Sequence, residues 1–450
     1  MKPHVLVVGG GLAGLQAALA CADGGARVTL LEARRRLGGA TWSHPHRGLG
    51  LEVDNGQHVF LRCCDRYLAF LDRLGVRSRV VLQPRLAVPV ARPGRALAWI
   101  RRAPLPAPAH LAPSLLRFPA LPFAQRVRAA LTARRFGSLD PECYALDRRS
   151  LGDWLREQGE SDAAVDTLWD LLIRPTLNLP AREASLALAA RVMRTGFLER
   201  ADGADIGWPA VPFSALHAEP AAAALRARGV RVEIGARVDA IEHDAAQPAL
   251  WSHGARLAAD AIVLATPHDE AAQLLHTRSE LRALAQLGAS PIVNLHVVFD
   301  RRVMAHALLA ALDSPLQWIF DRTHSAGLEE GQYLTASLSA ADRWQGHSSG
   351  ALRAIFLPAF AALLPAARDA RVLRFAVTRE PAATFRAVPG TRRLRPAPGS
   401  EHGGVFLAGA YTDTGWPATM ESAVRSGLAA ASAALRACAR RGRPTAKEAA

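Results

Sequence analysis

Near the N-terminus, three glycines have the spacing of a site that binds phosphate groups. Gly9, Gly11 and Gly14 form a G-x-G-x-x-G pattern directly after an apolar run at residues 4–8. In such a turn the first glycine permits a tight bend, the second lets the backbone approach a pyrophosphate, and the third lets a helix pack closely on a strand. The anion then faces the positive end of the helix. The pattern favours a dinucleotide site over a purely structural turn.

An acidic residue follows where a ribose would be bound. Glu32 ends the apolar run of residues 27–32, 18 residues after Gly14, and a carboxylate there would accept hydrogen bonds from a ribose diol and repel a 2′-phosphate. FAD and NAD share this half-site. The basic turn at residues 34–39 closes on two glycines and offers a second backbone approach to the cofactor, which favours FAD.

The sequence predicts that a strand, a helix and a second strand position these residues. Further strands are predicted at distant points along the chain. Continuous apolar runs are typical of parallel strands that are covered on both faces. Strands are predicted at residues 4–8, 27–32, 230–241, 261–265 and 405–408, with helices over residues 12–22 and from about Thr419. The predicted fold is α/β, with a discontinuous, Rossmann-like nucleotide-binding domain.

Two long insertions interrupt this domain. Residues 82–214 open with Pro- and Arg-rich sequence and continue as helices, whereas residues 271–394 mix strand-like runs with helices. They predict an interleaved α+β substrate domain. The predicted division is 1–81, 215–270 and 395–438 for the nucleotide-binding domain, 82–214 and 271–394 for the substrate domain, and 439–450 for a flexible tail.

The composition excludes several classes of protein. Half of the 450 residues are hydrophobic and a fifth are charged, which argues against a disordered or fibrous chain. The net charge of +15 rests on arginine, since Lys2 and Lys447 are the only lysines, but the arginines are spread along the chain and only 6% of residues are aromatic. We therefore expect no nucleic-acid binding. Attraction to anionic lipid headgroups is the stronger alternative.

The cysteine content and the hydropathy pattern indicate in which cellular compartment the protein is expected. Five cysteines without metal-ligand spacing indicate reduced thiols and no metal site. Glycines interrupt the apolar N-terminus, so a strand and a helix explain it better than a signal peptide. No later stretch has the ~20 uninterrupted apolar residues of a spanning helix. We expect a cytoplasmic protein that, at most, lies on the inner face of the membrane.

Taken together, these motifs resemble the FAD-dependent amine oxidase and phytoene desaturase superfamily. The resemblance rests on the G-x-G-x-x-G pattern, Glu32, the Arg-x-x-Gly-Gly turn, the late Ala-x-x-Pro strand end and the C-terminal glycine-rich strand-to-helix turn. Within the superfamily, the segments similar to the squalene-associated, hopanoid-linked hydroxysqualene dehydroxylases are 53–64, 175–186, 290–303 and 412–427. The similarity covers nearly the whole chain.

The resemblance implies which residues bind FAD. The predicted contacts are Gly9, Gly11, Leu12, Ala13, Gly14, Glu32, Ala33, Arg34, Arg36, Gly38, Gly39, Gly56, Gln57, Val238, Ala265, Gly409, Asp413, Thr419 and Met420. Val238 would contact the adenine through its backbone, and Thr419 would start a helix whose positive end faces the flavin. Gly56 either belongs to a tight Asn-Gly turn or lies near the flavin ring. Related oxidases carry Gly-Asp where this chain has Gly409-Ala410, so Asp413 or a backbone amide must replace that carboxylate.

The resemblance also implies a reaction. Hydroxysqualene would lose its hydroxyl group to give squalene, with hydride passing from N5 of reduced flavin to an allylic carbon of this C30 substrate. His58, Asp413 and Glu421 are the candidate acids for the leaving hydroxyl, and a water or substrate-bound network is an equal alternative. Each has a plainer role open to it: His58 could cap its own turn, Asp413 could bind the cofactor, and Glu421 could complement the helix dipole.

Other functions stay open. A carotenoid or phytoene-type FAD desaturase would reverse the electron flow, a non-catalytic protein would only bind FAD or a prenyl lipid, and charge alone would suit an RNA-binding flavoprotein. The single glycine-rich fingerprint identifies no electron donor. The implied partners are the C30 polyprenyl substrate and other enzymes of squalene and hopanoid biosynthesis. Residues 92–136 could rest on a bilayer and admit substrate, or form a Pro-rich loop and a solvated helix.

Overall fold

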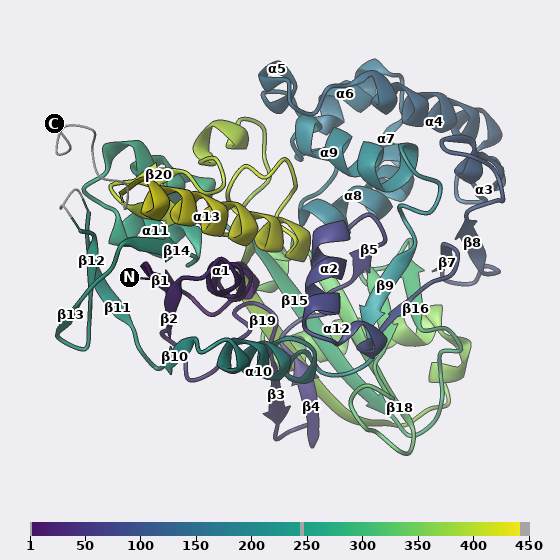
Figure 1. Ribbon diagram of the computed structural model, residues 1–450. Helices are drawn as coiled ribbons and strands as arrows, with labels where there is room; N and C mark the ends of the chain where they lie inside the picture. The colour runs from purple at the N-terminus through teal and green to yellow at the C-terminus, as the bar shows by residue number, and fades with distance from the viewer. Residues whose placement is uncertain (1, 244–246, 442–450) are drawn as a thin grey trace, which may run out of the picture.

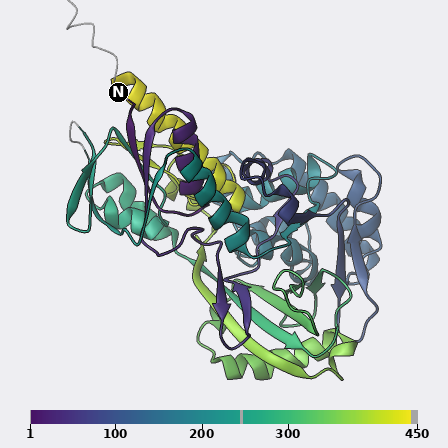
Figure 2. The ribbon, with the colours of Figure 1, turned by 60° about the horizontal axis from the view of Figure 1, so that its bottom comes forward.

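The computed structural model describes residues 2–243 and 247–441 (Figure 1). Its framework is a six-stranded sheet and a seven-stranded sheet, with a group of helices beside them (Figures 1 and 2).

The six-stranded sheet has the order β10-β2-β1-β14-β21-β20. Its strands are β1 (His4–Val8), β2 (Arg27–Glu32), β10 (Arg231–Ile234), β14 (Ala261–Leu264), β20 (Glu401–His402) and β21 (Val405–Leu407). Neighbouring strands are parallel, except that β20 runs antiparallel to β21. The parallel sheet, formed by apolar runs far apart in the sequence, confirms the predicted α/β architecture.

Both faces of this sheet are covered, which is why its strands lack a polar alternation. On one face, α1 (Leu12–Asp23) and α13 (Met420–Arg441) pack on side chains such as Val5 and Val7. Leu6 and Val8 point to the other face, toward a small antiparallel sheet and a helix. These are β11 (Val238–Glu242), β12 (Ala249–Ser252), β13 (Ala255–Ala258) and α11 (His268–Leu274).

The seven-stranded sheet has the order β19-β15-β18-β17-β16-β7-β8. Its strands are β7 (Ala87–Ala91), β8 (Ala98–Arg101), β15 (Ser290–Phe299), β16 (Leu308–Ala311), β17 (Trp318–Asp321), β18 (Gln332–Ser339) and β19 (Val372–Thr384). α12 (Ser349–Leu363) packs on one face of it (Figure 2). The first insertion was expected to continue as helices after its Pro- and Arg-rich opening, but that opening itself supplies two strands to this sheet.

Two smaller sheets join the layers. They are β3 (Ser43–His46) with β4 (Leu51–Asp54), and β9 (Ile206–Pro209) between β5 (Phe60–Leu61) and β6 (Val80–Leu82). Helix α2 (Asp65–Arg73) packs against α13, and α10 (Glu219–Ala227) packs against α1. The division of the chain into domains at the stated boundaries stays a prediction.

The remaining helices form one group (Figure 1). They are α3 (Ala112–Leu116), α4 (Phe123–Arg135), α5 (Tyr144–Asp147), α6 (Leu151–Glu157), α7 (Asp162–Ala164), α8 (Asp170–Leu177) and α9 (Leu186–Val192). α13 ends at Arg441, inside the segment predicted to be a tail, and the rest of that segment lies outside the described residues. In the described part of the chain, no helix has both the length and the apolar character needed to span a bilayer.

Candidate functional site

The glycine-rich turn lies between the end of β1 and the start of α1. A Cβ on Gly14 would be 1.9 Å from the carbonyl oxygen of Gly9, and a Cβ on Gly9, whose φ is +105°, would be 2.6 Å from that of Ala265. Only glycine fits at either position. Gly11 is the N-cap of α1 and has no side chain to occupy the N–H groups of the first turn. Those groups can therefore bind an anion.

Glu32 is buried at the end of β2 and is held by two backbone N–H groups. Gly10 N donates to Oε2 (2.6 Å) and Arg34 N donates to Oε1 (2.7 Å). A carboxylate offers about four acceptor positions, so each oxygen keeps one for a hydroxyl group. Glu32 therefore both fixes the glycine turn and can bind a ribose. Ala33 and Arg34 are exposed beside it.

The second glycine turn touches the first. Gly38 N donates to Gly10 O (2.9 Å), and a Cβ on Gly39 would be 2.7 Å from Gly11 Cα. Arg36 lies along this turn. Its Nη1 donates to Gly39 O (3.1 Å), and its guanidinium lies 3.9 Å from the centre of the Trp42 ring.

Burial lowers the pKa of Arg36 to about 10, yet the side chain stays cationic at neutral pH. Its partners in the turn are a carbonyl oxygen and an indole ring, which do not neutralise its charge. An anion bound between the two glycine turns would do so.

The carboxyl ends of β14 and β21 lie beside the same turn. Ala265 N donates to Val8 O (2.8 Å). Gly409, with a φ of +142°, donates from its N–H to Ser426 Oγ on α13 (2.9 Å). In open α/β sheets, ligands bind outside these strand ends.

The C-terminal helix also reaches this site. Thr419 Oγ1 accepts a hydrogen bond from Ser422 N (3.2 Å) and so caps α13, which begins at the buried Met420. A Cβ on Gly427 would be 2.2 Å from Ala13 O, so α13 crosses α1 in close contact (Figure 1). Residues more than 400 positions apart in the sequence thus meet.

Val238 begins β11 close to Glu32. Ala236 N donates to Glu32 O (2.9 Å) and Gly235 N donates to Arg34 O (3.0 Å). These bonds place the turn before β11 beside the end of β2. The backbone of Val238 therefore lies on the side of the site where Glu32 can hold a ribose.

Several buried polar atoms in the described part of the chain have no hydrogen-bond partner, and three of them belong to segments of this site: Thr266 Oγ1, Tyr411 OH and Gln57 Nε2. Thr266 and Tyr411 follow the ends of β14 and β21. Because an unsatisfied buried polar group costs about 1–3 kcal/mol, a bound ligand with polar groups would stabilise both hydroxyls. Together with the glycine turns and Arg36, these residues fit a dinucleotide.

Residues 54–58 are joined to the rest of the protein by polar contacts. Asp54 forms a buried ion pair with Arg322 (2.7 Å) and accepts a hydrogen bond from Phe213 N (3.1 Å). Gly56 lies against β15, where its Cβ would be 3.3 Å from Asn294 Nδ2. Tertiary contacts, beyond a local Asn-Gly turn, fix this segment.

Asn294 was not among the predicted residues. It is fully buried, and its bonds to Asn55 O (3.3 Å) and from Gln57 N (3.5 Å) are long. A signal existed in the sequence, because Asn294 and His296 are polar residues at spacing i, i+2 in an otherwise apolar strand and therefore share one face.

Glu421 is fully buried and its carboxylate is occupied. It accepts hydrogen bonds from Arg66 N (3.2 Å) and Tyr67 N (2.7 Å), and pairs with Arg425 Nε (2.6 Å). The two N–H groups belong to the first turn of α2, where a carboxylate is stabilised by the helix dipole. This arrangement ties α13 to α2.

Asp413 is ion-paired with two arginines. Arg392 Nε lies 2.8 Å from Oδ2, and Arg395 Nη1 lies 3.7 Å from Oδ1. Arg395 also donates to the carbonyl oxygens of Tyr411 and Thr412, so it holds the turn that carries Asp413.

Hydroxyl groups surround the position where related oxidases carry an aspartate. Ser422 Oγ donates to Ala410 O (3.2 Å) and lies 2.7 Å from Thr414 Oγ1. Because Asp413 is engaged with arginines, these hydroxyls are better candidates than Asp413 to replace the missing carboxylate.

His58 contacts its own turn through one ring nitrogen. Nδ1 lies 3.1 Å from Gly56 O, and the ring packs edge-on against Phe213 with centroids 5.0 Å apart. Burial lowers the pKa of His58 below its ordinary value of 6.5. Protonation of Nδ1 would satisfy the bond to Gly56 and leave Nε2 as an acceptor.

Two further buried histidines were missed by sequence reasoning. His217 bridges Thr41 Oγ1 (3.0 Å) and Tyr67 OH (2.9 Å). His296 bridges Tyr333 OH (2.6 Å) and Thr378 Oγ1 (3.0 Å). Burial lowers the pKa of both histidines to about 3, so both are neutral at physiological pH.

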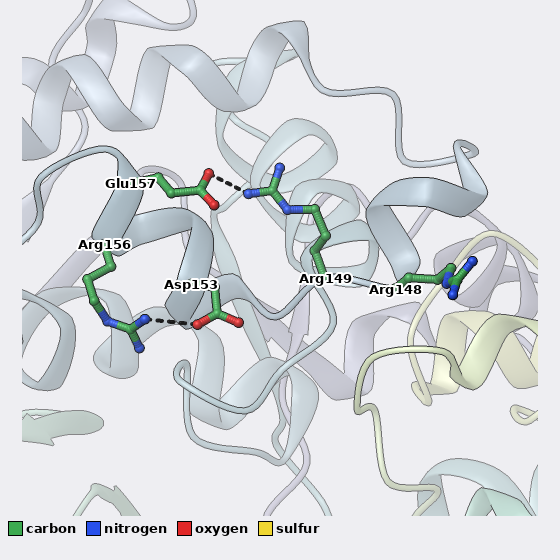
Figure 3. Close-up of a pocket in the computed structure, with 5 residues that line it drawn as sticks. All are labelled: Arg148, Arg149, Asp153, Arg156 and Glu157. Carbon is green, nitrogen blue, oxygen red and sulfur yellow. Dashed lines mark hydrogen bonds and ion pairs between the residues drawn. The ribbon is translucent and has the colours of Figure 1, made fainter.

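A surface depression elsewhere has a different character (Figure 3). It is lined by Arg148, Arg149, Asp153, Arg156 and Glu157. Arg149 pairs with Glu157, and Arg156 with Asp153 (2.9 Å). Since four of these five charged side chains pair with one another at the surface, we do not treat the depression as a candidate site. Among residues 2–243 and 247–441, no group of three or more His, Cys, Asp or Glu side chains could hold a metal ion.

Comparison with known proteins identifies relatives over nearly the whole chain. The family profile described as "Flavin containing amine oxidoreductase" matches residues 12–435. The chain is 28% identical to a hydroxysqualene dehydroxylase from Rhodopseudomonas palustris, covering 97% of this chain and 99% of that protein. It is 26% identical to a 15-cis-phytoene desaturase from Solanum lycopersicum, covering 96% of this chain and 78% of that protein.

The fold is shared with solved structures. Cyclohexylamine oxidase from Brevibacterium oxydans superposes with a TM-score of 0.74 at 22% identity, covering 98% of this chain and 100% of that one. This likeness confirms the predicted fold class, a Rossmann-like α/β fold with a second, interleaved part. The individual site residues stay predictions, supported by the contacts described above.

Proposed function

The chain belongs to the flavin-containing amine oxidoreductase family and is an FAD-dependent oxidoreductase; within that family, we propose that it reductively removes the hydroxyl group of hydroxysqualene to give squalene. The observation that carries the proposal is the extent of similarity. The chain aligns with 99% of the Rhodopseudomonas palustris dehydroxylase but with 78% of the tomato phytoene desaturase.

The reaction breaks one C–O bond and forms one C–H bond. The substrate gains a hydride, and its hydroxyl group takes a proton and leaves as water. When bound, FAD in its reduced form supplies the hydride. The protein must therefore hold the cofactor, exclude water from an electron-poor allylic carbon, and provide the proton.

Cofactor binding is assigned to the glycine turns and their neighbours. The N–H groups at the start of α1 and the guanidinium of Arg36 would hold the pyrophosphate, and Glu32 the ribose. The hydroxyls of Thr266 and Tyr411, which lack partners among the described residues, would be satisfied there.

Proton supply is assigned to His58. Glu421 and Asp413 have their carboxylates engaged by α2 and by arginines, whereas Nε2 of His58 forms no hydrogen bond with the described residues. Because its pKa is lowered, a proton held at Nε2 is readily given up.

The solubility of the proposed substrate also indicates where in the cell the protein acts. A C30 polyprene is insoluble in water, since each CH₂ costs ~0.8 kcal/mol to expose. We therefore place the protein in the cytoplasm at the inner face of the membrane, beside other enzymes of squalene and hopanoid biosynthesis.

The test is anaerobic incubation of the photoreduced, FAD-loaded protein with hydroxysqualene. Stoichiometric squalene with concurrent flavin reoxidation supports the proposal. Turnover of phytoene by the oxidised protein, with no squalene formed by the reduced one, would replace it with a desaturase. Retention of the lipid without turnover would indicate a non-catalytic protein that only binds the lipid.

A further inference from the structure

Helix α4 carries apolar side chains on the face that points away from the protein. Phe123, Val127 and Leu131 are 67%, 36% and 56% exposed. At about 100° per residue, their i, i+4, i+8 spacing places them within ~80° of one another around the axis. Ala129 and Thr132, on the opposite side, are buried. A surface helix of a soluble protein normally shows the reverse pattern.

Arginines flank this apolar stripe. Arg126 lies on one side, Arg128 and Arg135 lie on the other, and Arg134 lies at its C-terminal end. Arg126 donates to Leu121 O, and Arg128 and Arg135 donate to oxygens of Gln158. These partners are neutral, so the positive charge of the helix is not cancelled. We call the stripe and its four arginines the α4 face.

The charge around the α4 face is one-sided over a long stretch. Between Asp72 and Asp140 the sequence contains thirteen arginines and no aspartate or glutamate. Three of them, Arg73, Arg92 and Arg102, pair with aspartates from elsewhere in the chain. The excess is large compared with the net charge of +15 for the whole protein.

The neighbouring helix α6 provides an internal contrast. Its surroundings are also rich in arginine, but Arg149, just before α6, and Arg156, on it, both pair with carboxylates of this helix (Figure 3). Exposed arginines as such are therefore common to both helices. The α4 face differs in combining unneutralised arginines with exposed large apolar residues.

We propose that the α4 face is a docking surface for an anionic lipid bilayer. The apolar stripe would enter the boundary between headgroups and acyl chains, and the four arginines would contact lipid phosphates. The inference depends on the proposed function in one respect only, namely that a C30 substrate resides in lipid.

Nucleic acid is the other polyanion that such arginines would attract. It offers nothing for Phe123, Val127 and Leu131 to enter, because these side chains project from one helix face with arginines around them rather than lining a groove for bases. An anionic bilayer satisfies the charge and the apolar surface together.

The experiment is flotation of the FAD-loaded protein with vesicles of phosphatidylcholine alone or with a third of phosphatidylglycerol, at low and high salt. One variant removes charge from the α4 face (Arg134→Gln with Arg135→Gln). A second removes apolar surface (Leu131→Ser). Matched controls are Arg149→Gln with Arg156→Gln, whose side chains pair with carboxylates of α6, and Leu373→Ser on β19, where the leucine is 47% exposed. Binding is measured without turnover, so its failure is distinct from failure of the proposed reaction.

We expect the wild-type protein to float with the anionic vesicles and to be released by salt. At about fivefold per arginine near an anionic surface, the α4 charge variant should partition roughly 30-fold more weakly. Leu131→Ser should weaken partitioning by about tenfold, and both controls should bind like the wild type.

Equal binding by the α4 variants and their controls would overturn the proposal. So would loss of binding on charge removal with no effect of Leu131→Ser, which would indicate a polyanion site. Self-association of the protein that Leu131→Ser abolishes would assign the face to a second copy of the chain instead.

Discussion

The glycine turns at residues 9–14 and 38–39 and the region that holds His58, Asp413 and Glu421 were both predicted from residue types, but they depend on different kinds of interaction. In the turns, function rests on backbone N–H groups and on the absence of side chains, which local sequence determines. Around the three acidic or basic residues, function depends on which distant group occupies each side chain. Glu421 is held by residues more than 350 positions away. The type of a residue therefore predicts its function well where the backbone binds the ligand. It leaves the function ambiguous where the role depends on what the side chain contacts.

The largest effect is expected at the turn itself. In Gly14→Val, a Cβ 1.9 Å from Gly9 O would displace α1, at a cost of several kcal/mol. We expect purified protein without FAD and with a lowered melting temperature. Gly346→Ala is the control, because a Cβ there meets nothing within 4 Å. A Gly14→Val protein with full flavin absorbance would refute the role of the turn.

In the region where side chains act, buried histidines should make the stability of the folded protein depend on pH at low pH. His217 and His296 have a pKa of about 3 in the folded protein and about 6.5 when unfolded. The unfolded state therefore binds more protons between these values, and the folded state loses about 1.4 kcal/mol per pH unit for each histidine below pH 6.5.

Denaturation at pH 7, 6 and 5 measures this loss. In His296→Gln, which retains groups able to bond Tyr333 and Thr378, the slope should fall by about the contribution of one histidine. An unchanged slope in that variant would show that other groups govern the acid sensitivity. FAD binding at pH 7 should be unaffected, because the glycine turns do not contain these histidines.

Glu421→Gln separates structure from chemistry in the second region. The variant should lose roughly 1.5–3 kcal/mol of stability, because the amide keeps one acceptor oxygen but loses the negative charge that pairs with Arg425 and places an NH₂ group where the second oxygen accepts a hydrogen bond. Single-turnover flavin reoxidation at a temperature where the variant is folded should be unchanged. A slower reaction in the fully folded variant would restore Glu421 as an acid.

These contrasts show which parts of the structure could be predicted from the sequence. The strands β1, β2, β14 and β21 and the start of α13 follow from apolar runs and a glycine-rich turn. The positions of β7 and β8 could not be predicted in this way. Their segment is rich in proline and arginine, which are not typical of strands, and these short strands are stabilised by pairing with their neighbours in the sheet. The bridge from Thr41 through His217 to Tyr67 was equally hidden, since its members lie up to 176 residues apart.

Glu32→Gln tests whether the first region also depends on a side chain. The amide keeps one acceptor but places an NH₂ group against a backbone N–H, so the affinity for FAD should fall by about 10–100-fold. Titration of the apoprotein with FAD measures the affinity. The melting temperature of the apoprotein isolates the part due to fixing the turn at Gly10, and an affinity loss without a change in that temperature would indicate the ribose contact.

The smallest effect, and the sharpest distinction between the two regions, is expected at His58. If Nε2 delivers the proton, the single-turnover rate should rise about tenfold as the pH falls from 8.5 to 7.5, because in this range a group whose pKa is lowered below 6.5 has a protonated fraction proportional to proton concentration. His58→Gln should flatten that profile while FAD affinity stays the same, since no contact of the glycine turns involves this ring. The chosen pH range lies above the range where His217 and His296 destabilise the fold, so a retained slope in His58→Gln would mean that water or the substrate network supplies the proton.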